Sequence, residues 1–517
     1  MRQRILIALG IAIVGSAPVF GTEYFVATNG DNLAAGTAGA PWRTLQHAAN
    51  RVAPGDRVVV RPGNYVGFYL SRSGTSAAPI EFFAEPGALI NQRNATTPDG
   101  INLERASHII IDGFAVSGMP RAGVRSVGVP SDFAEFVTVR NVQASNNGTW
   151  GIFTGHVDDL LIESNRTWGS IDEHGIYVSN SGDRPVIRNN VIFDNHGSGI
   201  HMNGDESQGG DGIISDALVS GNVIYNNAKF DGTSLGGGSG INMDGVQNSR
   251  IENNLLYNNH ASGISLYSID AAEGASDNVV INNTVYQPNN GRWALNIRDG
   301  STGNSALNNI LLNQHSLRGA ISIDADSLSG FTSDYNVVIS RFTTDDGDSI
   351  LDLQDWREAT GNDQHSLVAT AAELFVNPAA DASGNYHLLA TAGAINTGTN
   401  QFAPTDDLDG LLRPVGAQVD IGAYEWRPAA LAGDYNGDGT VDAADYVVWR
   451  KTGGSQSSYD QWRTNFGHTG GSGSGATGFA SAAVPEPTAI VTLVIASLVG
   501  RPRRRRAVRS IFNSATK

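Results

Sequence analysis

The chain has 517 residues, with 51 acidic side chains, 34 Lys or Arg, 62 glycines and no cysteine. Its formal net charge is −17, and the nine Lys or Arg of residues 1–21 and 501–517 leave −26 for the remainder. A surface this acidic argues against nucleic acid and anionic membranes as partners. A polyanionic ligand could bind only where local cations, or bound calcium, reverse the negative electrostatic field of the surface. The lack of cysteine excludes a disulfide framework.

The N-terminal residues 1–21 have the pattern of a secretion signal. Arg2 and Arg4 precede an apolar run at residues 5–14, and a small residue, Gly21, offers a cleavage point. We therefore expect a secreted, extracellular or cell-surface protein whose folded part begins at residue 22.

From residue 151 onward the sequence repeats a glycine followed by alternating apolar and polar residues. The repeats begin at Gly151, Gly175, Gly199, Gly240 and Gly263, with a variant at Ala294. A second series in step with the first consists of Asn165, Asn190, Asn222, Asn254, Asn283 and Asn309. Short runs with period two and no helical period predict strands, one set per repeat, stacked as a solenoid. The asparagines are expected to stack at the turns and bind each other and the backbone.

The two ends of this region carry further motifs. Residues 24–30, 41–49 and 54–65 open it, and Asp406, Asp409, Arg413 and residues 420–425 close it. With the repeats, these segments resemble right-handed parallel β-helix proteins of the pectate-lyase-like superfamily. The resemblance implies an all-β, right-handed parallel β-helix over residues 22–426, with a short N-terminal capping helix and a polysaccharide ligand.

The two-residue period assigns alternate residues of each strand to opposite faces of the sheet. If Ile152, Ile176 and Ile200 point inward, the outward columns follow. The first is Phe153, Tyr177, His201, Asn242, Ser265 and Asn296, and the second is Gly155, Ser179, Asn203, Asp244, Tyr267 and Arg298. At about 4.8 Å per coil, each column spans about 24 Å, enough for several sugar rings. Four aromatic residues are placed to stack on sugars at its two ends: Trp150, Phe153, Tyr267 and Trp293.

The columns contain groups suited to β-elimination of a uronic-acid polymer. That reaction needs a base for the proton at C5, an acid for the leaving oxygen, and a partner for the carboxylate. His201 is the candidate base and Tyr177 the candidate acid. Arg298, or calcium held by Asp205 and Asp244, would neutralise the carboxylate.

Other residues near these columns are candidates for related roles. The interval between Gly199 and Gly240 is 17 residues longer than the usual 24, and its Lys229 is a rival base. The resemblance supports this rival, because pectate lyases often use Lys or Arg as base beside an aspartate-bound calcium. The predicted substrate-binding residues are Asn203, Asn242, Asp244, His174, Trp150, Trp293 and Tyr267.

Three alternative functions remain open. A glycoside hydrolase would use Asp205 and Asp244 as its carboxylate pair. A C5-epimerase would share the proton abstraction and return the proton on the opposite face. A non-catalytic glycan-binding or adhesion scaffold would use the same long surface without chemistry.

Residues 427–469 contain a second kind of motif. Oxygen ligands recur at the spacing of a 12-residue calcium loop, with Gly439 at its bend. They are Asp434, Asn436, Asp438, Thr440, Asp442 and Asp445. The loop and the helical segments after it resemble a dockerin module, although the usual second loop is missing. The resemblance implies bound Ca²⁺ and a cohesin-like or cell-surface partner.

The remaining residues form a linker and a tail. Residues 470–483 are a Gly/Ser/Ala linker. Residues 484–517 combine a Pro-Glu-Pro motif, an apolar stretch ending at Val499 and four arginines at 503–506. This pattern resembles the PEP-CTERM sorting tail, which implies transient retention at a membrane and processing by an exosortase.

Overall fold

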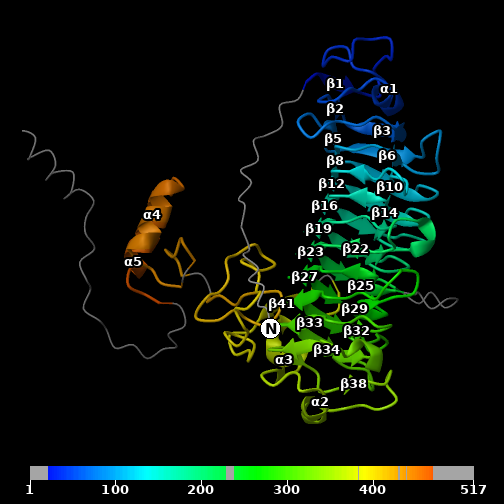
Figure 1. The fold of residues 1–517 in the computed structure, drawn as a ribbon. Coiled ribbons are helices and arrows are strands. Elements are labelled where there is room, and N and C mark those ends of the chain that lie inside the picture. Colours follow the sequence, from blue (N-terminus) through cyan, green and yellow to red (C-terminus); the bar gives the residue numbers. More distant parts are fainter. Residues whose placement is uncertain (1–20, 229–237, 382, 429–430, 438, 470–517) are drawn as a thin grey trace, which may run out of the picture. The chain divides into compact units, whose positions relative to one another are not determined.

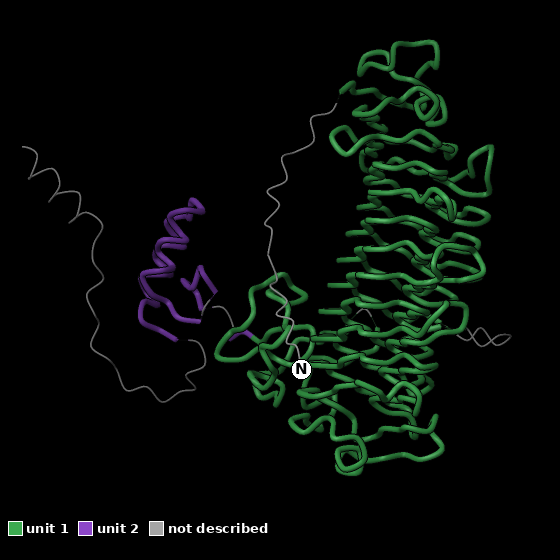
Figure 2. The backbone as a smooth tube through the Cα atoms, in the orientation of Figure 1, with its two compact units in different colours: residues 1–426 green, residues 427–517 purple. Residues whose placement is uncertain are grey.

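The computed structural model describes residues 21–228, 238–381, 383–428, 431–437 and 439–469. The predicted signal segment, Lys229, Asp438, the linker and the sorting tail lie outside the described residues. The chain divides into two compact units, residues 1–426 and residues 427–517 (Figure 2).

Unit 1 is built from coils that each contribute one strand to three parallel sheets, as predicted for a parallel β-helix (Figure 1). The first sheet contains β1 (Glu23–Val26), β2 (Arg57–Val60), β5 (Ile80–Ala84), β8 (Ile109–Asp112), β12 (Val137–Arg140), β16 (Leu161–Glu163), β19 (Val186–Arg188), β23 (Leu218–Ser220), β27 (Arg250–Glu252), β30 (Val279–Ile281), β33 (Ser305–Leu307) and β36 (Thr332–Asp334). The second sheet contains β4 (Phe68–Leu70), β7 (Ile101–Glu104), β10 (Ala122–Val127), β14 (Trp150–Gly155), β18 (Ile176–Ser179), β21 (Ile200–Asn203), β25 (Ser239–Asp244), β29 (Ser262–Tyr267), β32 (Leu295–Ile297), β35 (Ile321–Ile323) and β38 (Phe342–Thr343).

The third sheet contains β3 (Gly63–Val66), β6 (Ala88–Gln92), β9 (Ala115–Ser117), β13 (Gln143–Ser145), β17 (Arg166–Trp168), β20 (Val191–Phe193), β24 (Val223–Tyr225), β28 (Leu255–Tyr257), β31 (Thr284–Gln287), β34 (Ile310–Asn313), β37 (Val337–Val338) and β39 (Leu367–Val368). Short additional pairs are β11 (Ala134–Glu135) with β15 (Val157–Asp158), β22 (Ile214–Ser215) with β26 (Val246–Gln247), and the antiparallel β40 (Phe375–Asn377) with β41 (Asn385–Leu388). Two 3₁₀ turns, η1 (Glu206–Gln208) and η2 (Ala325–Ser327), follow β21 and β35.

The interior of the coils is a continuous apolar column. On the second sheet, register pairs Ile152 with Ile176, Ile176 with Ile200, and Ile200 with Ile241. All four side chains are fully buried. Because successive coils place the same residue type on the same spot, each coil covers the apolar face of the next.

Helices close the two ends of this column. At the N-terminal end, α1 (Leu45–Ala49) is capped by Thr44 and buries Leu45 and Ala48 against the first coils. At the other end, α2 (Leu353–Thr360) buries Trp356, which stacks on Phe342 with ring centroids 4.9 Å apart. The predicted N-terminal capping helix is thus present, and α2 covers the opposite end.

The asparagine series forms a continuous hydrogen-bonded ladder between the first and third sheets. In a typical rung, the Asn222 amide donates to Asn254 Oδ1 at 2.9 Å and to the Ile187 carbonyl at 2.9 Å. Its own Oδ1 accepts from the backbone and side chain of Asn190, both at 3.0 Å. The ladder begins at Asn165 and continues past Asn309 to Asn336.

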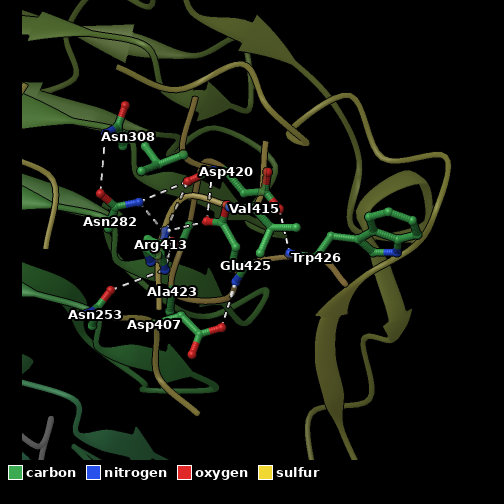
Figure 3. Close-up of polar contacts among 12 residues, drawn as sticks. Asn253, Asn282, Asn308, Asp407, Arg413, Val415, Asp420, Ala423, Glu425 and Trp426 are labelled. Carbon is green, nitrogen blue, oxygen red and sulfur yellow. Dashed lines mark hydrogen bonds and ion pairs between the residues drawn. The ribbon is translucent and has the colours of Figure 1, made fainter. Parts of the chain in front are cut away.

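A C-terminal segment, residues 371–426, begins with α3 (Ala371–Leu374) and then returns along the coils. Three asparagines on consecutive coils donate to its backbone carbonyls: Asn253 to Asp406 at 2.6 Å, Asn282 to Asp420 at 2.9 Å, and Asn308 to Thr399 at 2.8 Å. Figure 3 shows the second of these bonds, between Asn282 and Asp420. Beneath them, Arg413 and Glu425 form an ion pair 3.5 Å apart with no exposed side-chain surface.

Unit 2 contains two helices, α4 (Ala443–Lys451) and α5 (Gln456–Asn465), joined through Tyr446 and Trp462, whose rings lie 5.1 Å apart. The loop before α4 curls around the buried Asp445, whose carboxylate accepts the backbone N–H groups of Tyr435 and Asp442 at 2.7 Å. Among the described residues, none of the helices has both the length and the apolar character needed to cross a bilayer.

Candidate functional site

The outward face of the second sheet carries the predicted columns. Register aligns Tyr177 with His201, His201 with Asn242, and Asn242 with Ser265. The register expected from period two is therefore confirmed. Tyr177 and His201 are partly exposed, whereas Asn242 is buried.

Two histidines form the centre of this face. His174 lies in the turn before β18, and its Nε2 is 2.9 Å from Nδ1 of His201. On its other side, Nδ1 of His174 accepts the backbone N–H of Ser198 at 2.9 Å. Since a backbone N–H can only donate, His174 carries its proton on Nε2 and donates it to His201 Nδ1. A neutral His201 then carries its proton on Nε2.

Both imidazoles are neutral near pH 7. Burial lowers the pKa of His201 to about 4. Burial, and then the neighbouring charge of His201, hold the pKa of His174 well below its usual value. The Nε2 atom of His201 is buried and has no hydrogen-bond partner among the described residues. The free N–H of His201 is thus a proton donor at a buried position, and this hydrogen-bond chain supports the opposite of the basic role expected from the sequence.

Tyr177 lies beside the two histidines. Its ring centroid is 4.7 Å from that of His201 and 5.2 Å from that of His174. The Asn203 amide, from the second outward column, donates to the Tyr177 hydroxyl at 3.3 Å. Burial raises the pKa of Tyr177, so the phenol keeps its proton and can serve as an acid.

An aromatic wall borders the cluster on the N-terminal side. Trp150 stacks on Phe153 with centroids 4.3 Å apart, and Phe153 meets the Tyr177 ring edge-on at 5.3 Å. The Trp150 indole N–H donates to Glu173 at 2.6 Å. The structure therefore brings Trp150 to the cluster, where one ring face already packs on Phe153.

Asp244 and Asp205 are engaged within the protein. Asp244 is only 1% exposed, and its carboxylate accepts the backbone N–H groups of residues 269, 270 and 271 at 2.9 to 3.3 Å. Asp205 accepts from the hydroxyl and the backbone N–H of Ser207. Asp244 thus closes the turn after β29, and it does not face solvent as its column position suggested.

Over the described ranges of the chain, no group of three or more His, Cys, Asp or Glu is arranged to hold a metal ion. Calcium at Asp205 stays a prediction, as does the role of Lys229.

On the C-terminal side of the histidines the face is hollowed into a cleft of about 430 Å³. Asn242, Ser265 and Asn296 form its floor along the first outward column, and the Asn242 amide donates to the Tyr267 hydroxyl at 2.6 Å. Trp293 also lines the cleft but is 5% exposed, so little of its ring is available for stacking.

Three arginines surround this cleft: Arg292, Arg298 and Arg318. Arg298 was expected from the second outward column, and it forms an ion pair with Asp346. Arg292 and Arg318 were not expected, because both precede the strands and have no place in the period-two columns. The only available signal was their recurrence just before two successive second-sheet strands, β32 and β35.

Comparison with known proteins agrees with this architecture. A family model described as Pel9A-like, right-handed β-helix region, matches residues 24–304. The crystal structure of pectate lyase Pel9A has a TM-score of 0.54 at 16% identity, covering 79% of this chain and 97% of that chain. XylC in complex with xylose has a TM-score of 0.50 at 11% identity, covering 78% and 98%.

An alginate lyase from Paenibacillus sp. str. FPU-7 has a TM-score of 0.40 at 19% identity, covering 54% of this chain and 94% of that chain. No curated protein sequence matches the chain. At these identities the likeness to pectate lyase Pel9A and XylC shows the fold alone, whereas the family match covers more than half of the chain. The chain belongs to the Pel9A-like right-handed β-helix family.

Proposed function

We propose that this protein is a secreted polysaccharide lyase that cleaves a uronic-acid polymer by β-elimination. The observation that carries the proposal is the cluster of His174, His201 and Tyr177 on the outward face, continuous with a cleft lined by Arg298. Proton-transfer groups and a carboxylate partner on one face are what this reaction needs. The pectate lyase with the same fold is consistent with it.

The geometry suggests a division of roles. When the C5 proton leaves, negative charge spreads onto the uronate carboxyl group, and the N–H of neutral His201 can stabilise it as a fixed donor. The electron pair forms the C4–C5 double bond, the C4–O bond breaks, and Tyr177 protonates the leaving oxygen. In this division of roles Lys229, the rival base named from the sequence, takes the C5 proton.

A first prediction tests the lyase chemistry itself. Wild-type protein incubated with polygalacturonate or alginate should release unsaturated, ultraviolet-absorbing oligomers. His201→Ala should lower kcat by about 100-fold or more, since removing one fixed donor to a developing oxyanion costs that much in other enzymes. Arg188→Gln, a surface change on the first sheet, serves as the control. Unchanged turnover in His201→Ala would remove His201 from the mechanism.

Product analysis distinguishes the alternatives. A glycoside hydrolase would release reducing ends without ultraviolet absorbance, but the engagement of Asp244 by three backbone N–H groups leaves it poorly suited to that role. A C5-epimerase would change the proton NMR spectrum of the polymer without shortening it. A binding scaffold would retain glycans and yield no product.

Calcium binding in unit 2 is a second proposal. Residues 434–445 carry the oxygen ligands of a calcium loop, and Asp434 already accepts the backbone N–H groups of Gly437 and Gly439 at 2.8 and 2.9 Å. We expect Ca²⁺ to raise the melting temperature of a fragment of residues 427–469 only when Asp434 is intact. A cohesin-like or cell-surface partner and exosortase processing of the tail are proposed on the sequence motifs alone.

A further inference from the structure

The cleft beside the histidine cluster is cationic in an otherwise acidic protein. Its lining contains three arginines, Arg292, Arg298 and Arg318, against two carboxylates, Asp299 and Asp346. The chain as a whole carries a formal charge of −17. A local excess of positive charge on such a surface concentrates anionic ligands at one place.

The three arginines are not equivalent. The guanidinium group of Arg298 is engaged by Asp346, whose pKa is lowered mainly by that hydrogen bond and further by the charge of Arg318. Arg292 and Arg318 form no ion pair with any carboxylate in the described part of the chain. Neither guanidinium group is therefore held in a direct ion pair within these residues, and each keeps its donors for a ligand.

The backbones that carry Arg292 and Arg318 are held in place on both sides. The N–H of Arg292 donates to the Ala261 carbonyl at 2.8 Å, and the Arg292 carbonyl accepts from the buried Asn313 amide. The Arg318 carbonyl accepts from Arg341 Nε at 3.1 Å, and Arg341 also donates to the Asn313 carbonyl at 3.0 Å. One hydrogen-bonded network thus fixes both positions. Both side chains therefore extend from fixed backbone positions at the cleft.

The cleft lies at a defined distance from the histidines. Its floor residues Asn242, Ser265 and Asn296 follow His201 by one, two and three coils in register. At about 4.8 Å per coil, this corresponds to about 5 to 14 Å along the face. A polymer that places one sugar unit at His201 would therefore extend its next units into the cleft.

We propose that the cleft is a subsite for carboxylate-bearing sugar units, bound by the guanidinium groups of Arg292 and Arg318. The choice of ligand rests on the proposed function. Guanidinium groups suit this ligand because their planar donors match a carboxylate in a bidentate fashion. Binding here holds the polymer in one direction across His201, so that binding energy from units remote from the reacting carbon contributes to catalysis.

The test measures binding separately from chemistry. Tetragalacturonate, the tetramer of alginate uronates and neutral cellotetraose are titrated calorimetrically into the full chain carrying His201→Asn, which limits turnover. We expect an acidic tetramer to bind more tightly than cellotetraose. Arg292→Gln combined with Arg318→Gln should weaken that binding by about tenfold or more, as expected for lost charge-assisted hydrogen bonds. Arg188→Gln, paired with Glu163 outside the cleft, is the matched control and should bind normally.

Two outcomes overturn the inference: acidic tetramers that do not bind, or that bind equally well after both arginines are replaced. The melting temperature of the double variant checks folding, and it should not change because neither guanidinium group is in an ion pair. A different result would overturn the proposed lyase function. If wild type yields no unsaturated product while the double variant loses acidic binding, the subsite stands and the lyase assignment falls.

Discussion

The histidine pair illustrates how one backbone group can set the chemistry of a side chain two contacts away. The N–H of Ser198 fixes the proton of His174, and His174 in turn fixes that of His201. Because burial keeps both rings neutral, the second ring carries its donor on Nε2. His174, which the sequence suggested as a substrate ligand, is therefore a positioning residue for His201 in this arrangement.

The tautomers can be checked directly. In protein labelled with ¹⁵N-histidine at pH 7, both His174 and His201 should show a protonated Nε2 and an unprotonated Nδ1, because the Ser198 N–H admits only that arrangement. Spectra of His174→Phe and His201→Asn assign the signals. In His174→Phe, which lacks the donor to Nδ1, His201 should lose its preference for the tautomer protonated on Nε2. A proton on Nδ1 of His201 in the wild type would contradict the assignment.

The depressed pKa of His201 also predicts a pH dependence of stability. Between pH 6.5 and pH 4 the unfolded chain binds a proton at this imidazole and the folded chain does not. The contribution of His201 to the free energy of unfolding is therefore complete above pH 6.5 and falls by about 3 kcal/mol as the pH falls to 4. Denaturation of wild type and His201→Asn across this window measures it as a difference. Parallel curves for the two proteins would refute the shift.

The asparagine ladder shows how identical elements stabilise one another. Each buried rung donates to the next coil and to a carbonyl of the preceding one, so that the polar groups at the turns are satisfied without water. The structure contains a second such ladder at Asn195, Asn227 and Asn259. The asparagines predicted from the sequence belong to the first ladder only.

Truncation of one rung should be costly. Asn222→Ala removes the acceptor of the Asn190 N–H and the donor to the Ile187 carbonyl, both of which stay buried. Two unsatisfied groups correspond to a loss of about 2 to 6 kcal/mol in the free energy of unfolding. Chemical denaturation measures this loss, with the exposed strand change Asn91→Ala as the control, expected within about 0.5 kcal/mol. A similarly small effect for Asn222→Ala would show that the ladder is not stabilising.

Across the whole of unit 1, the C-terminal segment is bound to the coils by polar groups buried beneath it. Glu425 pairs with Arg413 and also accepts the backbone N–H groups of Val415 and Asp420 at 2.7 and 3.0 Å. Removing one partner of a buried pair leaves the other charge uncompensated. From the sequence, Arg413 and residues 420–425 are expected only to close the β-helix, whereas the structure buries the side chains of Arg413 and Glu425 completely.

Glu425→Gln should therefore destabilise unit 1 by about 3 to 5 kcal/mol. Calorimetric melting of the full chain measures the change. Glu163→Gln breaks a surface pair with Arg188 and should cost about 1 kcal/mol or less. Equal effects of the two substitutions would mean that the buried pair adds nothing beyond a surface contact.

The sequence predicted the coils well and the site only in part. Repetition made the register of Tyr177, His201 and Asn242 readable, because one alternating pattern recurs coil after coil. It could not reveal that Asp244 turns back to bind backbone amides, since column position does not specify hydrogen-bond partners. The pattern also did not predict the cleft arginines Arg292 and Arg318 as site residues, because both lie outside the alternating strands.

The returning C-terminal segment has a further consequence for how such a protein can change size. Asn253, Asn282 and Asn308 hold it at three adjacent levels of the stack. Inserting or deleting a whole level between them would pull these anchors out of alignment by about 4.8 Å. Duplication of a level between residues 253 and 308 is therefore disfavoured, whereas a level added ahead of β27, on the side that holds the histidines, leaves the spacing of the three anchors unchanged.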